Sequence, residues 1–235
     1  MSDIQNGNVN TFTPVEANSP EVDPVVAAFQ AGSLIVYPTE AVMGIGCDPD
    51  NEAAVNALLE IKQRPVEKGV ILIAANYSQL LPYVNDNAIR PDRRTDIFSS
   101  WPGPNTWLLP KSSSAPVWLT GKHSKIAVRV TSHPVVVELC NKLGKPLVST
   151  SANLTGQPPA TTTEEAKAVF ADSVFYVEGE VGGATKPSTI RDGDTAEVIL
   201  SLIHISEPTR RYAIGGARVG VEKKRGGGGG GGGGG

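Results

Sequence analysis

Short apolar runs alternate with stretches of helical periodicity along residues 23–199. Continuous apolar runs predict buried strands, whereas apolar positions three and four residues apart predict amphipathic helices. The alternation of the two patterns is typical of an α/β domain built on a mixed, twisted sheet. The predicted strands are 34–37, 70–74, 106–109, 126–130, 147–151, 174–177, 188–191 and 197–199.

Capping residues mark the ends of the predicted helices. Asp23 and Pro24 fit an N-cap followed by proline in the first turn, and Gly32 closes that helix. Asn51 caps a helix with Val55, Leu58 and Leu59 on its apolar side. Three further helices are predicted: from Pro91 to about Ser99, from Pro134 to Leu143 with Gly144 as C-cap, and after a Thr163 cap with Ala166, Val169 and Phe170 on the apolar side.

Composition indicates one ordinary globular domain. The chain has 235 residues, of which 40% are hydrophobic and 19% charged. No apolar run reaches membrane-spanning length, and residues 1–19 are polar, so we expect a flexible N-terminal segment without a signal peptide. Cys47 and Cys140 have no CxxC partner, and three scattered histidines make no zinc pattern. We therefore expect a cytoplasmic protein with no membrane association and no protein-bound metal.

The C-terminal 36 residues differ from the rest. Residues 226–235 are an unbroken glycine run, and residues 200–210 match the translation of a common transposase sequencing adapter. We expect the catalytic domain to span residues 20–199 and residues 200–235 to be a non-native, disordered tail; a natural or engineered flexible tail is the alternative. Without the tail's net +4, the formal charge of −3 becomes −7, which disfavours a strongly basic nucleic-acid binder.

Two polar segments follow predicted elements closely. Tyr37-Pro-Thr-Glu40 comes after a buried strand, where a hydroxyl and a carboxylate are placed for ligand contact, although Pro and Thr are also common in simple turns. Lys62-Gln-Arg64-Pro65 ends a helix. Two cations there can clamp a polyphosphate, but cations at a helix C-terminus also complement its dipole.

Two more polar segments lie on strands. Ser149-Thr-Ser-Ala-Asn153 ends the most apolar strand, and ligands of open α/β sheets bind beyond such carboxyl ends. An Asx or Ser turn that merely stops the strand is the alternative. Arg129 lies within a strand and must face solvent or pair with an anion, which is either a substrate carboxylate or a structural Asp or Glu. Pro187-Ser-Thr189 is a similar hydroxyl-rich strand entry.

Together, and in this order, these segments resemble the YrdC/TsaC family of threonylcarbamoyl-AMP synthases, in its short bacterial branch. The resemblance covers about residues 22–199. The segments that carry it are Tyr37-Pro-Thr-Glu-Ala-Val-Met-Gly-Ile-Gly46, Lys62-Gln-Arg-Pro65, Trp101-Pro-Gly-Pro104, Ala127-Val-Arg129, Ser149-Thr-Ser-Ala-Asn153 and Pro187-Ser-Thr-Ile190.

The resemblance implies a reaction, a fold and a site. Members condense L-threonine, bicarbonate and ATP into threonylcarbamoyl-AMP and pyrophosphate, for later transfer to adenosine 37 of tRNA by partner proteins. The implied fold is a single YrdC-like domain whose twisted sheet and flanking helices surround a concave, positively lined cavity. Mg²⁺ is expected with ATP, and weak RNA binding is allowed. The implied residues are Lys62 and Arg64 for catalysis, these two with Ser151 and Asn153 for ATP, and Thr39, Arg129, Ser149 and Ser188 for threonine.

One position departs from the family pattern. Members carry an arginine shortly after the last strand, and Leu200 stands there in this chain. The rival readings are a non-catalytic RNA-binding protein, a related carbamoyl-adenylate domain of hydrogenase maturation, and a structural module. The acidic balance disfavours the first, because phosphate contacts dominate nucleic-acid affinity. Neither a zinc-finger nor an acylphosphatase module accompanies the domain, as the second requires, and clustered hydroxyls and cations disfavour the third.

Overall fold

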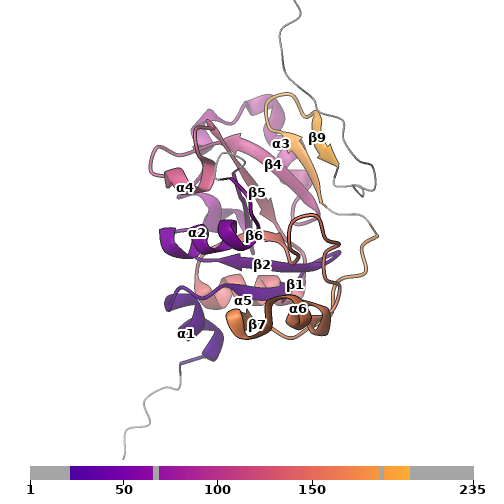
Figure 1. Ribbon diagram of the computed structural model, residues 1–235. Helices are drawn as coiled ribbons and strands as arrows, with labels where there is room; N and C mark the ends of the chain where they lie inside the picture. The colour runs from indigo at the N-terminus through magenta and orange to yellow at the C-terminus, as the bar shows by residue number, and fades with distance from the viewer. Residues whose placement is uncertain (1–21, 66–68, 186–187, 202–235) are drawn as a thin grey trace, which may run out of the picture. The chain divides into compact units, whose positions relative to one another are not determined.

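The computed structural model describes residues 22–65, 69–185 and 188–201, in which helices flank one mixed sheet (Figure 1). Its order along the described strands is β7-β1-β2-β6-β3-β5-β4-β8-β9. The strands are β1 (Ile35–Pro38), β2 (Met43–Cys47), β3 (Ile71–Ala74), β4 (Asn105–Pro110), β5 (Lys125–Val130), β6 (Leu147–Ser151), β7 (Phe175–Tyr176), β8 (Thr189–Asp192) and β9 (Val198–Ser201). The α-helices are α1 (Pro24–Gln30), α2 (Glu52–Ile61), α3 (Pro91–Ser99), α4 (Val117–Thr120), α5 (Pro134–Leu143) and α6 (Thr163–Phe170), and 3-10 turns cover Tyr77–Leu80, Asp86–Ala88 and Ala171–Ser173.

The sheet mixes parallel and antiparallel pairs, as predicted. β1 with β7, β3 with β5 and β4 with β8 run parallel, and the other neighbouring pairs run antiparallel. β3 pairs with antiparallel β6 on one side and with parallel β5 on the other, so segments from distant parts of the sequence meet in the middle of one sheet. The expected α/β class is therefore confirmed.

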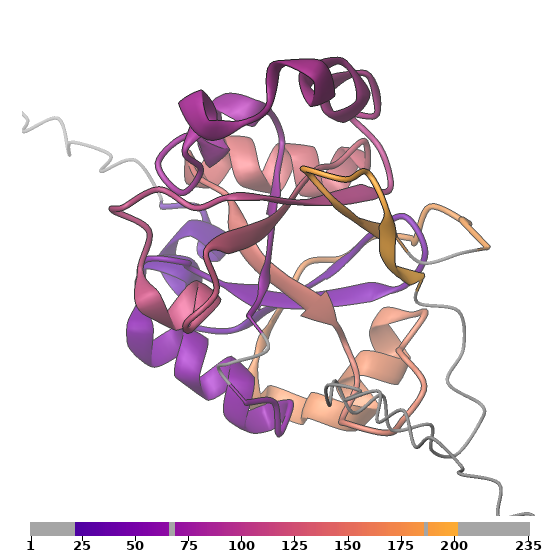
Figure 2. The same cartoon turned by 90° about the horizontal axis from the view of Figure 1, so that it is seen from above.

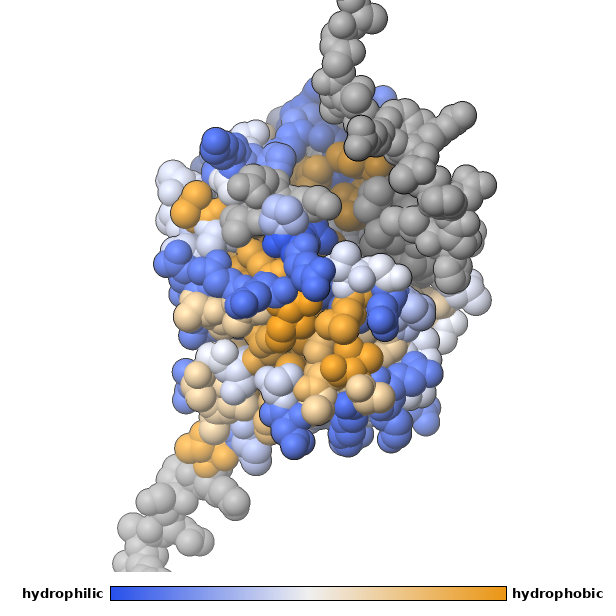
Figure 3. Space-filling model, viewed as in Figure 1, coloured by the Kyte–Doolittle hydropathy of each residue, from blue (hydrophilic) through white to orange (hydrophobic). Residues whose placement is uncertain are grey.

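Each face of the sheet has its own core, because side chains alternate along a strand. On β1, Val36 packs into one cluster with α2 and α6, whereas Ile35 and Tyr37 pack into the other with α1 and α5. Figure 2 shows α5 on one side of the sheet and α2 and α6 on the other. The face seen in Figure 1 carries an apolar area between hydrophilic ones (Figure 3).

The helix caps follow the sequence signals with one correction. The side chain of Asp23 accepts a hydrogen bond from Val25 N, and that of Asn51 accepts one from Ala54 N. Gly144 takes the left-handed conformation, with φ of 69°, at the end of α5. The cap of α6 is Thr162 rather than Thr163, because its side chain accepts from Glu165 N.

Three further details differ from the sequence prediction. On α6, Ala166 and Phe170 are buried as expected, but Val169 is 37% exposed and does not join the apolar side. β2 and α4 were not predicted. β9 runs to Ser201, and Leu200 pairs with Ile190, so regular structure extends two residues past the boundary expected at Ile199. The segments 1–19 and 202–235, for which disorder was expected, lie outside the described residues, as does Pro187.

Candidate functional site

Lys62 joins the end of α2 to the end of β6. It is the C-cap of the helix, and its backbone N–H donates to Leu58 O at 3.1 Å. Its ammonium donates to Ser151 O at 2.7 Å, to Asn153 O at 2.8 Å and to Asn153 Oδ1 at 2.7 Å. These bonds use all three donors of the ammonium group. With 7% of its surface exposed, Lys62 is held by protein oxygens in a buried position.

Hydrogen bonds fix the loop that Lys62 contacts. Ser151 Oγ donates to Asn153 Oδ1 at 2.7 Å, and Asn153 Nδ2 donates to Gln157 O at 2.6 Å. Thr155 Oγ1 donates to the backbone oxygen of Lys62, which ties the loop back to the helix end. Three of the predicted residues, Lys62, Ser151 and Asn153, therefore form one connected polar cluster, which we call the lysine cluster.

Burial changes the proton affinity of the two cations. Desolvation, helped by the neighbouring Arg64 charge, lowers the pKa of Lys62 to about 8. Desolvation also lowers the pKa of Arg64. Both residues line a cavity of about 30 Å³ together with Ser149 and Thr150. A ligand-sized pocket holds roughly 300–1,000 Å³, so this cavity is too small for a nucleotide, and the expected concave, positively lined cavity stays a prediction.

A second polar cluster forms around Arg129 on β5. One terminal nitrogen, Nη2, lies 3.6 Å from Glu40 Oε2, so this arginine has a protein carboxylate beside it. Glu40 Oε1 accepts from Thr131 Oγ1 at 2.5 Å, and Thr131 Oγ1 accepts from His133 N at 3.0 Å. Arg129 is 8% exposed. We call Glu40, Arg129, Thr131 and His133 the arginine cluster.

The other residues predicted to bind L-threonine lie outside the arginine cluster. Thr39 Oγ1 donates to Val42 O at 2.7 Å, which closes a local turn. The lone pairs of the Thr39 hydroxyl can still accept hydrogen bonds. Ser149 is buried on β6. The Tyr37 hydroxyl donates to the backbone oxygen of the preceding Val148 at 3.5 Å, and burial raises the pKa of that phenol. Ser188 directly precedes β8, and no side-chain hydrogen bond to another described residue links it to either cluster.

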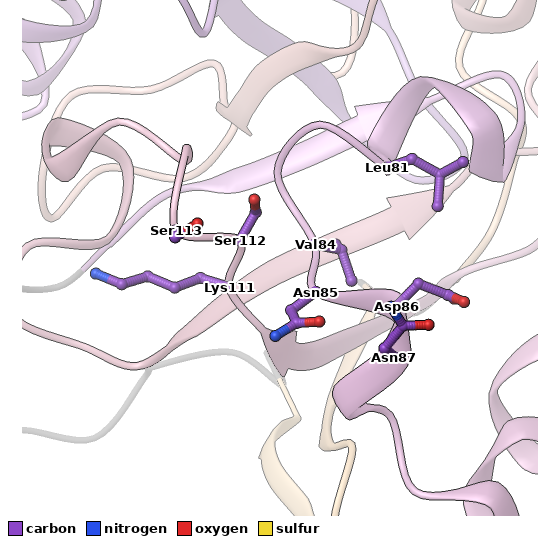
Figure 4. Close-up of a pocket in the computed structure, with 8 residues that line it drawn as sticks. All are labelled: Leu81, Val84, Asn85, Asp86, Asn87, Lys111, Ser112 and Ser113. Atoms are coloured by element: carbon purple, nitrogen blue, oxygen red, sulfur yellow. The ribbon is translucent and has the colours of Figure 1, made fainter.

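A larger cavity of about 500 Å³ lies elsewhere and contains none of the predicted residues. Asn85, Asp86 and Asn87 lie on one side of it, and Lys111 extends away from them (Figure 4). Lys111 Nζ donates to Thr120 Oγ1, and Asp86 binds Arg94, so its charged groups already have protein partners. We do not assign the chemistry to this cavity, because buried charges lie at the two clusters instead, and the arginine cluster also holds buried polar atoms without a hydrogen-bond partner among the described residues.

Within the described parts of the chain, no group of three or more His, Cys, Asp or Glu side chains could hold a metal ion. The same residues include no helix long and apolar enough to cross a membrane.

Sequence reasoning singled out Glu40 for ligand contact without giving it a role, and it assigned nothing to Thr131 and Thr155. Thr131 and Thr155 follow β5 and β6 just after the recognised segments. The available signal was a hydroxyl directly after β5 for Thr131, and one in the loop beyond β6 for Thr155. Trp107 is buried, and Trp101 packs against the core.

Comparison with known proteins gives the family. The family model Sua5/YciO/YrdC, described as "Telomere recombination", matches residues 27–200. A "Threonylcarbamoyl-AMP synthase" of Pseudoalteromonas atlantica is 56% identical over 177 residues, which cover 75% of this chain and 95% of the relative. A protein of the same name from Enterobacter sp. (strain 638) is 60% identical over 164 residues, covering 70% and 86%.

Solved structures agree with the sequence relatives. The crystal structure of E. coli YciO matches with a TM-score of 0.63 and 28% identity, over 75% of this chain and 86% of that one. P. abyssi Sua5, solved as a complex with L-threonine, matches with a TM-score of 0.64 and 29% identity over 71% of this chain. The match spans about half, 49%, of that protein. Because the family model covers most of the chain and the relatives share more than half of the aligned residues, this chain belongs to the Sua5/YciO/YrdC family.

Proposed function

We propose that this chain is a threonylcarbamoyl-AMP synthase, which condenses L-threonine, bicarbonate and ATP into threonylcarbamoyl-AMP with release of pyrophosphate. The observation that carries the proposal is its 51–60% identity to proteins of that name, over nearly their full length in most cases. The product is the activated intermediate for threonylcarbamoylation of tRNA, so the reaction is the first step of that modification.

The lysine cluster is the proposed ATP site. Lys62 and Arg64 bind the phosphates and offset the charge that develops on departing pyrophosphate, which is their catalytic role. Ser151 and Asn153 contact the nucleotide. Since the Lys62 ammonium already donates three hydrogen bonds to Ser151 and Asn153, a phosphate oxygen must replace at least one of these acceptors. Binding of ATP is therefore coupled to a change in the loop 151–153.

The arginine cluster, with Thr39, Ser149 and Ser188, is the proposed threonine site. Arg129 binds the substrate carboxylate, since a guanidinium donates in the geometry that a carboxylate accepts. Thr39 offers acceptor lone pairs, and Ser149 lines the small cavity next to Lys62 and Arg64. Catalysis is mainly positioning and electrostatic stabilisation.

Other components follow from the reaction. Mg²⁺ would arrive with ATP and be held mainly by phosphates and water, because the described residues offer no acidic cage for it. The product requires a downstream complex that transfers the threonylcarbamoyl group to tRNA, and we place the chain in the cytoplasm with its substrates. Weak tRNA binding is compatible with the proposal.

The test is pyrophosphate release by the purified full chain from ATP and bicarbonate, with and without L-threonine. Release that requires both threonine and bicarbonate is the expected result. ATP cleavage that ignores threonine, or binding of RNA with a steep salt dependence and no ATP turnover, would move the function to the RNA-binding alternative.

A further inference from the structure

The arginine cluster contains buried polar atoms that the described residues leave unused. Glu40 Oε2 lies near the Arg129 guanidinium at 3.6 Å but accepts no hydrogen bond from any described residue. Arg129 is only 8% exposed, yet its Nε donates a hydrogen bond to none of the described residues. His133 Nδ1 is a third buried polar atom of this cluster without a hydrogen-bond partner among the described residues. Buried polar groups are nearly always hydrogen-bonded, so these atoms require an explanation.

The position of Glu40 is fixed from several sides. Its carboxylate accepts from Thr131 Oγ1 at 2.5 Å, and the Thr131 hydroxyl is oriented by the bond it accepts from His133 N. Its backbone oxygen accepts from Ala184 N at 2.8 Å, and the preceding Thr39 oxygen accepts from Gly182 N at 2.9 Å. The unused oxygen Oε2 is therefore held in place rather than left at the end of a mobile side chain.

The two unused groups come from distant strands of the sheet. Glu40 follows β1, and Arg129 lies on β5, with β2, β6 and β3 between them in the sheet order (Figure 1). The neighbouring carboxylate and guanidinium can each form further hydrogen bonds. They therefore complement a ligand that has both a negatively and a positively charged group. The carboxylate and ammonium of an α-amino acid are such a pair, on adjacent atoms.

We propose that Glu40 binds the α-ammonium group of the amino-acid substrate through Oε2, while Arg129 binds its carboxylate. The inference rests on the proposed function and assigns Glu40 a role in substrate specificity. Ligand binding then gives Glu40 Oε2 and Arg129 Nε hydrogen-bond partners, and the zwitterionic ligand adds no net charge to the cluster. Thr131 acts as a positioning residue, because its hydroxyl holds the other carboxylate oxygen and leaves Oε2 for the substrate.

The test compares two ligands that differ only at the ammonium group. Calorimetric titration measures the Kd of L-threonine and of its 2-hydroxy analogue, with α,β-methylene-ATP present to prevent turnover. We expect Glu40→Gln to raise the Kd of threonine about 10- to 100-fold, since it removes a charge-assisted bond, and to change that of the analogue by less than about 3-fold. The matched control Asp86→Asn removes a carboxylate from another arginine pair, that with Arg94, and should change neither Kd.

A second variant keeps the inference testable if Glu40→Gln does not fold. Thr131→Val keeps the Glu40 charge but removes its positioning bond, so it should weaken threonine more than the analogue, and less than Glu40→Gln does. Equal weakening of both ligands, or no weakening of threonine, would overturn the inference while leaving threonine-dependent turnover by the wild type intact. Binding of α,β-methylene-ATP by a wild type that does not bind threonine would instead overturn the proposed function, and the inference with it.

Discussion

The ammonium of Lys62 lies 2.7 Å from the side-chain oxygen of Asn153, although 91 positions separate the two residues. The contact makes one unit of two motifs, Lys-x-Arg at the end of α2 and Ser-x-Asn at the end of β6. Because Ser151 donates to the same Asn153 oxygen, the loop has a defined geometry before any nucleotide binds. Substitutions in either motif should therefore affect the same step.

Lys62→Ala should abolish threonine-dependent pyrophosphate release, with a loss of about 100-fold or more, because it removes a buried cation from the proposed phosphate site. A coupled pyrophosphate assay measures the effect. Lys145→Ala is the matched control, since Lys145 is also partly buried and binds Asp48 at 2.8 Å and Asp50 at 2.6 Å. A Lys62→Ala enzyme that kept more than a tenth of wild-type activity would contradict the proposed role.

ATP affinity should fall as the pH rises through about 8, the pKa to which burial lowers Lys62. Below that pH the ammonium is protonated and attracts phosphate; above it the neutral amine does not, while the triphosphate stays fully ionised. Titrations between pH 7 and 9.5 should show Kd constant at the acidic end and increasing up to about tenfold per pH unit at the basic end.

Lys62→Arg is the control for this pH dependence, because a guanidinium stays protonated over the whole range. Its ATP affinity, whatever its value at pH 7, should not change with pH. A wild type whose ATP affinity was level up to pH 9.5 would show that Lys62 keeps its ordinary pKa or does not contact the phosphates.

Local signals were sufficient to predict most of the fold. Helices begin at Asp23 and Asn51 because their side chains cap the first turn, and a helix ends at Gly144 because glycine adopts the left-handed conformation. These roles can be predicted from neighbouring residues alone. β2 could not be predicted, because two of its five residues are glycine, which usually weakens a strand. Gly46 is explained only by Val148 and Tyr37, which approach it from other strands.

The candidate site likewise has features that local sequence signals predict and features that depend on distant strands. The segment containing Glu40 was singled out because hydroxyls and carboxylates at strand ends are typical of ligand contact. Its partner Arg129 was identified separately, as a charge within a strand that needed an anion. Their pairing depends on the strand order β1-β2-β6-β3-β5, which no local pattern encodes. The roles of individual residues came from the family resemblance and stay predictions.

Neither cysteine should react with a thiol reagent in the native protein at pH 8. Burial raises the pKa of both Cys47 and Cys140 to about 12, so almost no thiolate is present, and both side chains are inaccessible. Ellman's reagent should detect no thiol in the folded chain and two after unfolding in guanidinium chloride. Rapid modification of one thiol under native conditions would show that its part of the core opens readily.

Gly46→Ala should destabilise the protein more than a glycine substitution that only strains the backbone. A Cβ at position 46 would lie 1.8 Å from Val148 O and 2.9 Å from the Tyr37 hydroxyl, so β2 and β6 would have to separate. We expect a loss of about 2–3 kcal/mol in the free energy of unfolding, measured by urea denaturation. The control is Gly144→Ala, where a Cβ meets nothing within 4 Å and only the φ of 69° is unfavourable, at a cost of about 1 kcal/mol. Equal losses for the two variants would mean that β2 and β6 separate at little cost, and the lysine cluster at the end of β6 would then be less rigidly held than its hydrogen bonds indicate.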